Sequence, residues 1–176
     1  MEDQIIISRI LNEFDVKKDL LDRFRVACER LVEQILESED IKVHKVTSRV
    51  KDRDRLEEKL KRADKEYQSL DAITDTLGIR IITHFEDEVD RVGTVIEREF
   101  STDTEKSVDK RKMLDPDRFG YLSLHYICSL NEDRCKLPEY RQYELLTFEV
   151  QIRSILQHAW AEIEHDLGYK TGAAVP

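Results

Sequence analysis

The sequence predicts an α+β (α/β) fold, in which a mixed β-sheet is flanked by helices and preceded by a long N-terminal helix. Apolar residues recur at three- and four-residue steps from Leu20 to Leu36, which is typical of a helix with one buried face. Strand-like and helix-like segments alternate in the first half of the chain, and strand-like segments cluster in the second half. This distribution indicates an α/β or α+β fold with a mixed sheet.

The composition is that of a globular protein with no membrane-spanning segment. The 176 residues suffice for one domain, and 40% of them are hydrophobic and 38% charged. No apolar run approaches the roughly 18 residues that a transmembrane helix needs. The acidic start Met1-Glu2-Asp3 is unlike a signal peptide, so we expect a cytoplasmic protein. Three scattered cysteines without Cys-x-x-Cys spacing indicate reduced structural thiols rather than a zinc site or disulfides.

The charge is unevenly distributed along the chain. The formal net charge of −9 disfavours broad electrostatic adhesion to nucleic acid. Residues 1–40 hold eleven acidic and six basic side chains, whereas residues 41–65 hold ten Lys or Arg against five acids. A local positive patch on an acidic protein suits a small polyphosphate ligand, although a solvated helix face would give the same composition.

Residues 1–40 are expected to form a helical segment, followed by a second unit over 41–176. A short amphipathic stretch, Ile5 to Phe14, precedes Asp15, which is a suitable N-cap for the long helix. This helix carries no recognisable chemistry. Its apolar face fits the core of a monomer and the contact surface of a homo-oligomer equally well.

Residues 41–67 predict a strand that passes into a charged helix. Ile41–Val50 is rich in β-branched residues, and Lys51–Tyr67 has a narrow apolar stripe at helical spacing. The cations that would converge at this junction are Arg49, Lys51, Lys59 and Arg62. Converging cations are what a triphosphate needs for binding and for neutralisation of charge in a transition state.

A turn and a buried strand follow, and they carry a carboxylate and a further cation. Asp75 lies just before the strand Ile79–Phe85, and Arg80 lies within it as an additional candidate for phosphate binding. A carboxylate in this position often only caps a turn. Paired with Glu149 from another strand, Asp75 would instead provide oxygen ligands for Mg²⁺, an ion usually held by one or two carboxylates plus substrate phosphates.

The middle of the chain predicts a helix over Glu86–Phe100 and then an exposed segment, Ser101–Pro116. The exposed segment has little apolar patterning and is expected to be an edge strand or a mobile loop that becomes ordered over a substrate. A strand pattern resumes at Phe119. Its candidate site residues, all on one face, are Tyr121, Ser123 and His125. An aromatic ring, a hydroxyl and an imidazole in a row can stack on a base and hydrogen-bond its edge or ribose.

The segment 148–153 is the clearest strand and the candidate floor of an active site. Its side chains alternate with a period of two residues. The apolar set is Phe148, Val150 and Ile152, and the polar set is Glu149, Gln151 and Arg153. An ordinary half-buried strand shows the same alternation, but an acceptor, an amide and a fixed cation in one row could also hold a metal ion and a phosphate. Ser154 is expected to cap a final helix, Ile155–Leu167.

Five motifs spread over residues 47–170 resemble, in order and spacing, the synthetase domain of the RelA/SpoT alarmone synthetases. They are Thr47-Ser-Arg-Val-Lys, Ile73-Thr-Asp-Thr-Leu-Gly-Ile-Arg, Gly120-Tyr-Leu-Ser-Leu-His, Phe148-Glu-Val-Gln-Ile-Arg and Ala161-Glu-Ile-Glu-His-Asp-Leu-Gly-Tyr-Lys. The resemblance implies a nucleotidyltransferase-like fold. It also implies transfer of pyrophosphate from ATP to the 3′-hydroxyl of GTP or GDP, which leaves AMP and (p)ppGpp.

The resemblance implies a role for each matching residue. Asp75 matches the family's magnesium-binding aspartate, and Glu149 matches its catalytic glutamate, which helps to bind the metal or activates the attacking hydroxyl. Tyr121 matches the tyrosine that stacks on the acceptor guanine, and His125 lies in the same motif. The other matches are Arg49 and Lys51 with the basic pair near the adenine and phosphates of ATP, and Gln151 and Arg153 with positioning groups.

Departures from the family pattern leave the acceptor open. Leu122 stands where the usual motif has Arg, and residues 115–119 differ from the common Pro-Lys-x-Asn. With both changes, the chain resembles the sequences of a branch of single-domain synthetases in which some members are toxins that pyrophosphorylate the 3′ end of tRNA. A catalytically silent nucleotide-binding module is a further alternative, although the joint presence of Asp75, Glu149 and Tyr121 speaks against it.

The family's hydrolase domain is expected to be absent, because His44 is the sole histidine before Asp75 and that domain's metal site needs several. The dipeptide His165-Asp166 lies within a synthetase motif and is expected to be structural. The sequence stops after Thr171-Gly-Ala-Ala-Val-Pro176 with no capping element, so we expect a catalytic fragment of a longer protein.

Overall fold

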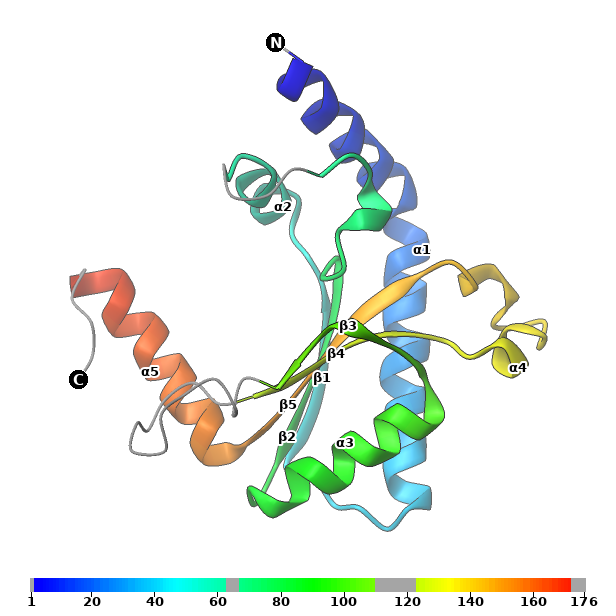
Figure 1. Ribbon diagram of the computed structural model, residues 1–176, viewed down its shortest axis with the longest axis vertical. Coiled ribbons are helices and arrows are strands. Elements are labelled where there is room, and N and C mark those ends of the chain that lie inside the picture. The colour runs from blue at the N-terminus through cyan, green and yellow to red at the C-terminus, as the bar shows by residue number, and fades with distance from the viewer. Residues whose placement is uncertain (1, 63–66, 110–122, 172–176) are drawn as a thin grey trace.

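The computed structural model describes residues 2–62, 67–109 and 123–171, and a mixed β-sheet lies at their centre (Figure 1). Its strands, in spatial order, are β1 (Lys45–Val50), β2 (Leu77–Thr83), β5 (Thr147–Ser154), β4 (Leu124–Ser129) and β3 (Ser101–Asp109). Strands β2 and β5 run parallel, and the other neighbouring pairs are antiparallel. The predicted α+β fold with a mixed sheet is therefore confirmed.

Helices α1 (Glu2–Ser38) and α3 (Asp87–Glu99) cover the same face of the sheet (Figure 1). Phe148 of β5 packs between them, because its ring centroid lies 5.7 Å from that of Phe24 in α1 and 5.4 Å from that of Phe100 at the end of α3. Phe148, Val150 and Ile152 have no exposed surface. The apolar half of the predicted alternation thus forms the centre of the core, and the polar half faces away from α1 and α3.

Two further helices closely follow β1 and β5. Helix α2 (Arg53–Leu60) follows β1 and packs on α1, where Leu56 is fully buried. Helix α5 (Ile155–Thr171) follows β5 and contacts β2 and β5. Short elements complete the fold: the 3₁₀ turns η1 (Leu70–Ala72) and η3 (Arg141–Tyr143), and the helix α4 (Glu132–Cys135).

The prediction that Ser154 caps the final helix is confirmed. The backbone N–H of Gln157 donates to Ser154 Oγ at 3.3 Å, and the backbone N–H of Ser154 donates to Gln157 Oε1 at 2.9 Å. This reciprocal pair is a capping box, which satisfies two backbone donors that the first turn leaves without partners. Gln157 also donates through Nε2 to Glu86 Oε1 at 3.2 Å, which ties α5 to the start of α3.

The prediction that Asp15 begins a separate helix is wrong, because α1 runs without a break from Glu2 to Ser38. The apolar stripe continues across this point through the buried Phe14 and Leu21, and neither Gly nor Pro precedes Gly78 in the chain. Burial of a continuous face outweighs the local capping preference. The Asp15 side chain is instead half-exposed and accepts from Arg53 Nε at 3.1 Å.

Several predicted boundaries shift. The helix expected over 51–67 ends at Leu60, the strand expected over 41–50 begins at Lys45, and the strand expected over 79–85 runs from Leu77 to Thr83. The exposed segment expected over 101–116 is an edge strand over its described part, 101–109.

Among the helices of the described residues, none is long and apolar enough to span a membrane. All three cysteines are buried free thiols, and burial raises the pKa of Cys128 to about 12.

Gly93 of α3 lies against two side chains of β4, and we expect a larger side chain at this position to destabilise the fold. A Cβ added there would lie 2.7 Å from Leu124 Cδ2 and 3.1 Å from Tyr126 Oη. Both neighbouring side chains are buried, so Gly93→Val should lower the free energy of unfolding by about 1–3 kcal/mol. Thermal melting measures the effect. Thr94→Val, on the exposed side of the same helix, is the control, and equal melting temperatures for both variants would contradict this packing.

Candidate active site

The strand register places three positions in a row on the polar face of the sheet. Arg49 of β1 lies opposite Gly78 of β2, and Gly78 lies opposite Glu149 of β5. Directly opposed residues point to the same side of a sheet. Gly78 has no side chain, and a Cβ added there would meet no atom within 4 Å. The row therefore has an open space between a cation and a carboxylate.

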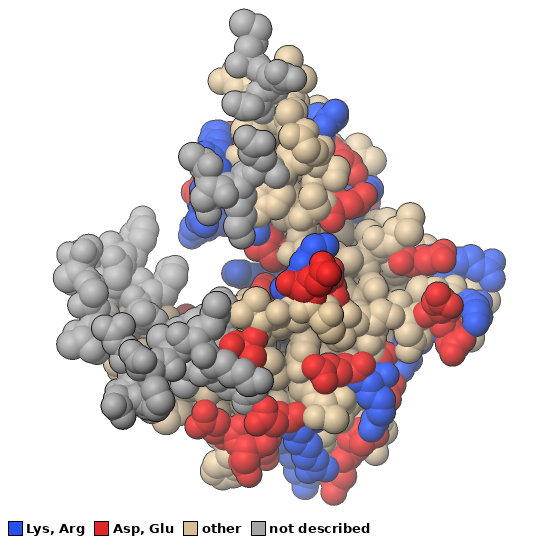
Figure 2. All heavy atoms as spheres, in the orientation of Figure 1, with Lys and Arg blue, Asp and Glu red and all other residues tan. Residues whose placement is uncertain are grey.

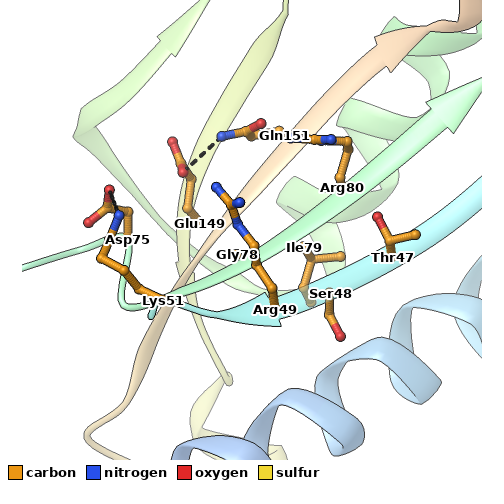
Figure 3. Close-up of a pocket in the computed structure, with 10 residues that line it drawn as sticks. All are labelled: Thr47, Ser48, Arg49, Lys51, Asp75, Gly78, Ile79, Arg80, Glu149 and Gln151. Atoms are coloured by element: carbon orange, nitrogen blue, oxygen red, sulfur yellow. Dashed lines mark hydrogen bonds and ion pairs between the residues drawn. The ribbon is translucent and has the colours of Figure 1, made fainter. Parts of the chain in front are cut away.

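This space is part of a pocket of about 300 Å³ (Figure 3). Its lining residues come from β1 and the residue after it, from β2 and the turn before it, and from β5, and they are Thr47, Ser48, Arg49, Lys51, Asp75, Gly78, Ile79, Arg80, Glu149 and Gln151. Figure 3 shows Arg49 and Glu149 directed to the same side of the sheet, whereas Ser48 points toward the helix behind it. Six of the predicted site residues thus line one pocket.

Asp75 is held at one side of this pocket by two lysines. Its carboxylate accepts from Lys59 Nζ at 2.7 Å and forms an ion pair with Lys51 Nζ at 3.1 Å. Burial alone would raise the pKa of Asp75, but the hydrogen bond from Lys59 and the charge of Lys51 outweigh burial and lower it. Burial would lower the pKa of Lys59, but the hydrogen bond and charge of Asp75, together with the contribution of Tyr67, outweigh burial and raise it. The carboxylate is therefore ionised at neutral pH.

Glu149 is held by partners on both of its oxygens. Oε1 lies 2.8 Å from His125 Nδ1, and Oε2 accepts from Gln151 Nε2 at 3.0 Å. Burial would raise the pKa of Glu149, yet the hydrogen bond and charge of His125 outweigh burial and lower this pKa below its usual value. The negative charge of Asp75 opposes this lowering. The two carboxylates are thus close enough to repel each other, and a divalent cation between them would relieve that repulsion.

Arg80 and Arg153 lie on the polar face but differ in access to the pocket. Arg80 lines it, and its Nη1 lies 3.6 Å from Glu162 Oε1 of α5. The Arg153 side chain is only 2% exposed and is not among the lining residues of the described chain; its Nη2 lies 3.7 Å from the same Glu162 oxygen. Glu162 therefore links the sheet to α5 through both arginines.

Among the predicted site residues that the structure describes, Arg62 is not brought into this arrangement. Arg62 lies beyond the end of α2 as an exposed side chain, outside the set that lines the pocket. Tyr121, with the remainder of 110–122, lies outside the described residues, as does the side chain of His165. Figure 2 shows Lys and Arg side chains, with Asp and Glu among them, on the part of the molecule that carries α2. Of the predicted basic stretch 41–65, Arg49 and Lys51 line the pocket and Lys59 contacts Asp75.

Several residues of this region, among them Thr47, Gly78 and Glu162, were not predicted as site residues. Thr47 lies two positions before Arg49 on β1, so its place on the same face follows from the strand period. Gly78 interrupts a run of apolar strand residues, and a glycine inside a strand often marks a close approach of ligand or backbone. Glu162 gave no comparable signal, because it lies in a helix whose orientation against the sheet is set by tertiary packing.

The chain is similar in sequence to a known protein family and to two named proteins. The family described as "Region found in RelA / SpoT proteins" matches residues 48–174. GTP pyrophosphokinase YjbM of Bacillus subtilis (strain 168) is 30% identical over 132 residues, covering 74% of this chain and 59% of YjbM. GTP pyrophosphokinase YwaC of the same strain is 32% identical over 104 residues, covering 59% of this chain and 46% of YwaC. The chain therefore spans only about half the length of these curated relatives.

The fold also matches solved structures. The crystal structure of small alarmone synthetase 1 from Bacillus subtilis superposes with a TM-score of 0.69 at 25% identity, covering 92% of this chain and 83% of that one. The same synthetase bound to its product pppGpp superposes with a TM-score of 0.66 at 24% identity, covering 94% and 82%. The family match includes most of the residues that line the pocket. The chain thus belongs to the RelA/SpoT family.

Proposed function

We propose that this chain transfers pyrophosphate from ATP to the 3′-hydroxyl of GTP or GDP, giving AMP and (p)ppGpp. The observation that carries the proposal is the pair of ionised carboxylates, Asp75 and Glu149, which line one pocket with the cations Arg49, Lys51 and Arg80. The relatives named GTP pyrophosphokinase, and the related synthetase bound to pppGpp, support the same reaction.

The reaction needs positioning and charge neutralisation more than covalent help from the protein. The acceptor 3′-oxygen forms a bond with the β-phosphorus of ATP, and the bond from that phosphorus to the α,β-bridging oxygen breaks, so that AMP leaves with this oxygen. Glu149 accepts the proton of the hydroxyl, which then passes to solvent. Arg49, Lys51 and Arg80 would meet the charge on the triphosphate, with Lys59 beside Asp75.

The carboxylates of Asp75 and Glu149 are suitable ligands for Mg²⁺. In the part of the chain that the structure describes, no group of three or more His, Cys, Asp or Glu could hold a metal ion. Two carboxylates completed by substrate phosphates are nonetheless the usual protein contribution to a nucleotide-bound magnesium. When bound, the ion would neutralise charge on the phosphate oxygens. Lys51 and Lys59 hold Asp75 in the ligand-free protein, and a triphosphate would offer them alternative anionic partners.

The acceptor can be identified by measuring the transfer of label from γ-³²P-ATP in the presence of Mg²⁺. GDP, GTP and bulk tRNA are supplied as separate acceptors. We expect label on the guanosine nucleotides, in amounts equal to the AMP formed. Label on tRNA alone would replace this proposal with tRNA 3′-end modification. No label on any acceptor, from a protein that binds ATP, would replace it with a silent nucleotide-binding module.

Lys51 provides a test of the donor side of the pocket. Lys51→Met should raise the KM for ATP by about 10- to 100-fold, because a charge-assisted hydrogen bond contributes about 1.5–3 kcal/mol. Initial rates are measured over a range of ATP concentrations at saturating acceptor. The control is Lys61→Met, since Lys61 is exposed and pairs with Glu57 at 2.6 Å, outside the pocket. An unchanged KM for ATP in Lys51→Met would remove Lys51 from the donor site.

A further inference from the structure

Gly78 lies inside a regular strand. It is the second residue of β2, opposed by Arg49 of β1 on one side and by Glu149 of β5 on the other, and the register of both pairings continues through it without a shift. A glycine at such a position weakens a strand, because it loses more conformational freedom on folding than any other residue and packs no side chain. The local structure therefore favours a larger residue at position 78, above all a β-branched one.

Neither the backbone nor packing within the described residues requires a glycine here. The φ angle of Gly78 lies outside the left-handed region that favours glycine. A Cβ added to Gly78 would meet no atom of the described residues within 4 Å, whereas a Cβ added to Gly93 would lie 2.7 Å from Leu124 Cδ2. Packing thus explains the glycine at position 93 but not the one at position 78.

The space over Gly78 belongs to the pocket of about 300 Å³, which Gly78 itself lines. Arg49 and Glu149 border this space from the two neighbouring strands, and their backbones are two strand spacings apart, or roughly 10 Å. Figure 3 shows both side chains on the same side of the sheet, with Asp75 to the left of Glu149. The backbone of Gly78 is therefore the floor between a cation and the two carboxylates.

A nucleoside triphosphate suits this floor chemically. Its phosphates need cations, and Arg49, Lys51 and Arg80 line the same pocket. Its metal ion needs oxygen ligands, which the carboxylates of Asp75 and Glu149 can provide. The phosphates that are transferred belong to ATP, so the nucleotide whose phosphates lie between these cations and both carboxylates is the donor.

We propose that the missing side chain of Gly78 admits the donor nucleotide, so that ATP lies across the backbone of Gly78 and the size of the residue at position 78 limits ATP binding. The identity of the nucleotide rests on the proposed function, whereas the pocket and its lining do not. A larger side chain would occupy space that ATP needs without disturbing the described core. Larger residues should therefore weaken ATP binding while the fold stays as stable or becomes more stable.

The graded series Gly78→Ala, Gly78→Val and Gly78→Leu is compared by isothermal titration calorimetry with α,β-methylene-ATP and Mg²⁺. This analogue cannot transfer pyrophosphate, because carbon replaces the bridging oxygen of the bond that breaks. The dissociation constant should rise less than about threefold for Gly78→Ala, about tenfold for Gly78→Val and at least about 30-fold for Gly78→Leu, as for side chains forced into filled space. Melting temperatures should equal or exceed that of the unmodified protein.

Ser101→Val is the matched control, because Ser101 is an exposed residue of the edge strand β3 and is not among the described residues that line the pocket. It also introduces a β-branched residue into a strand, yet its dissociation constant for the analogue should equal that of the unmodified protein. Steady-state kinetics shows which nucleotide is affected. In Gly78→Val the KM for ATP should rise about tenfold, and the KM for the guanosine nucleotide should stay within about twofold.

Unchanged binding of the analogue in Gly78→Leu would overturn the proposal, because ATP could not then lie across this residue. A lower melting temperature in Gly78→Ala would also overturn it, since the glycine would then serve the fold. A rise in the KM for the guanosine nucleotide alone would assign the space to the acceptor instead.

The binding measurement separates this inference from the proposed function. If the unmodified protein binds the analogue and Gly78→Leu does not, but ATP gives no transfer product, the proposed function is refuted and the position of the nucleotide stands. If the unmodified protein does not bind the analogue at all, both are refuted.

Discussion

Glu149→Gln is expected to lower kcat by at least about a thousandfold, because the substitution removes the proton acceptor and one of two carboxylates while keeping the side-chain shape. The amide oxygen can still accept from His125, so the fold and the melting temperature should change little. Rates are measured by AMP release with GTP or GDP as acceptor.

The matched control is Glu144→Gln, an exposed glutamate in the segment before β5, which should retain full activity. If Glu149→Gln turned over at near the rate of the unmodified protein, Glu149 would not be the proton acceptor. The substitution therefore tests the chemical role of Glu149 apart from its part in the structure.

Asp75→Asn should lower kcat/KM by about 100- to 1000-fold and raise the Mg²⁺ concentration needed for half-maximal rate. The neutral amide is a weaker magnesium ligand, and its loss of charge leaves Lys51 and Lys59 without their anionic partner in the free protein. Titration of Mg²⁺ at fixed ATP and acceptor gives both quantities.

Asp71→Asn is the control for this substitution, because Asp71 lies in the adjoining 3₁₀ turn and is well exposed, where it pairs with Lys17 at 3.2 Å. Its Mg²⁺ dependence should equal that of the unmodified protein. The assignment of Asp75 to the metal would be withdrawn if Asp75→Asn lost activity with the same half-maximal Mg²⁺ concentration.

The floor of the site could be predicted from the sequence because it depends on one local period. In 148–153 the side-chain alternation assigns Phe148, Val150 and Ile152 to the core and Glu149 to the opposite face, and the structure agrees. Asp75 was predicted correctly as a turn residue before β2, since the apolar run after it marks the strand. Both predictions needed only neighbouring residues.

The contacts of the site could not be predicted, because they depend on strand order and register. The hydrogen bond between His125 and Glu149 exists because β4 lies beside β5 with His125 opposite Gln151. No pattern within either strand specifies that pairing. Likewise, Lys59 contacts Asp75 from α2, a helix that packs on α1, whereas Arg62, three residues later, is past the end of that helix.

The central claim is that both terminal phosphates of ATP move together to a 3′-hydroxyl, and ³¹P NMR of a reaction containing ATP, GDP and Mg²⁺ tests it most directly. The proposal predicts two coupled resonances of a new 3′-pyrophosphate group on the guanosine nucleotide, together with one AMP for each product molecule. Formation of ADP with an acceptor that carries a single added phosphate would contradict it, because transfer would then have occurred at the γ-phosphorus.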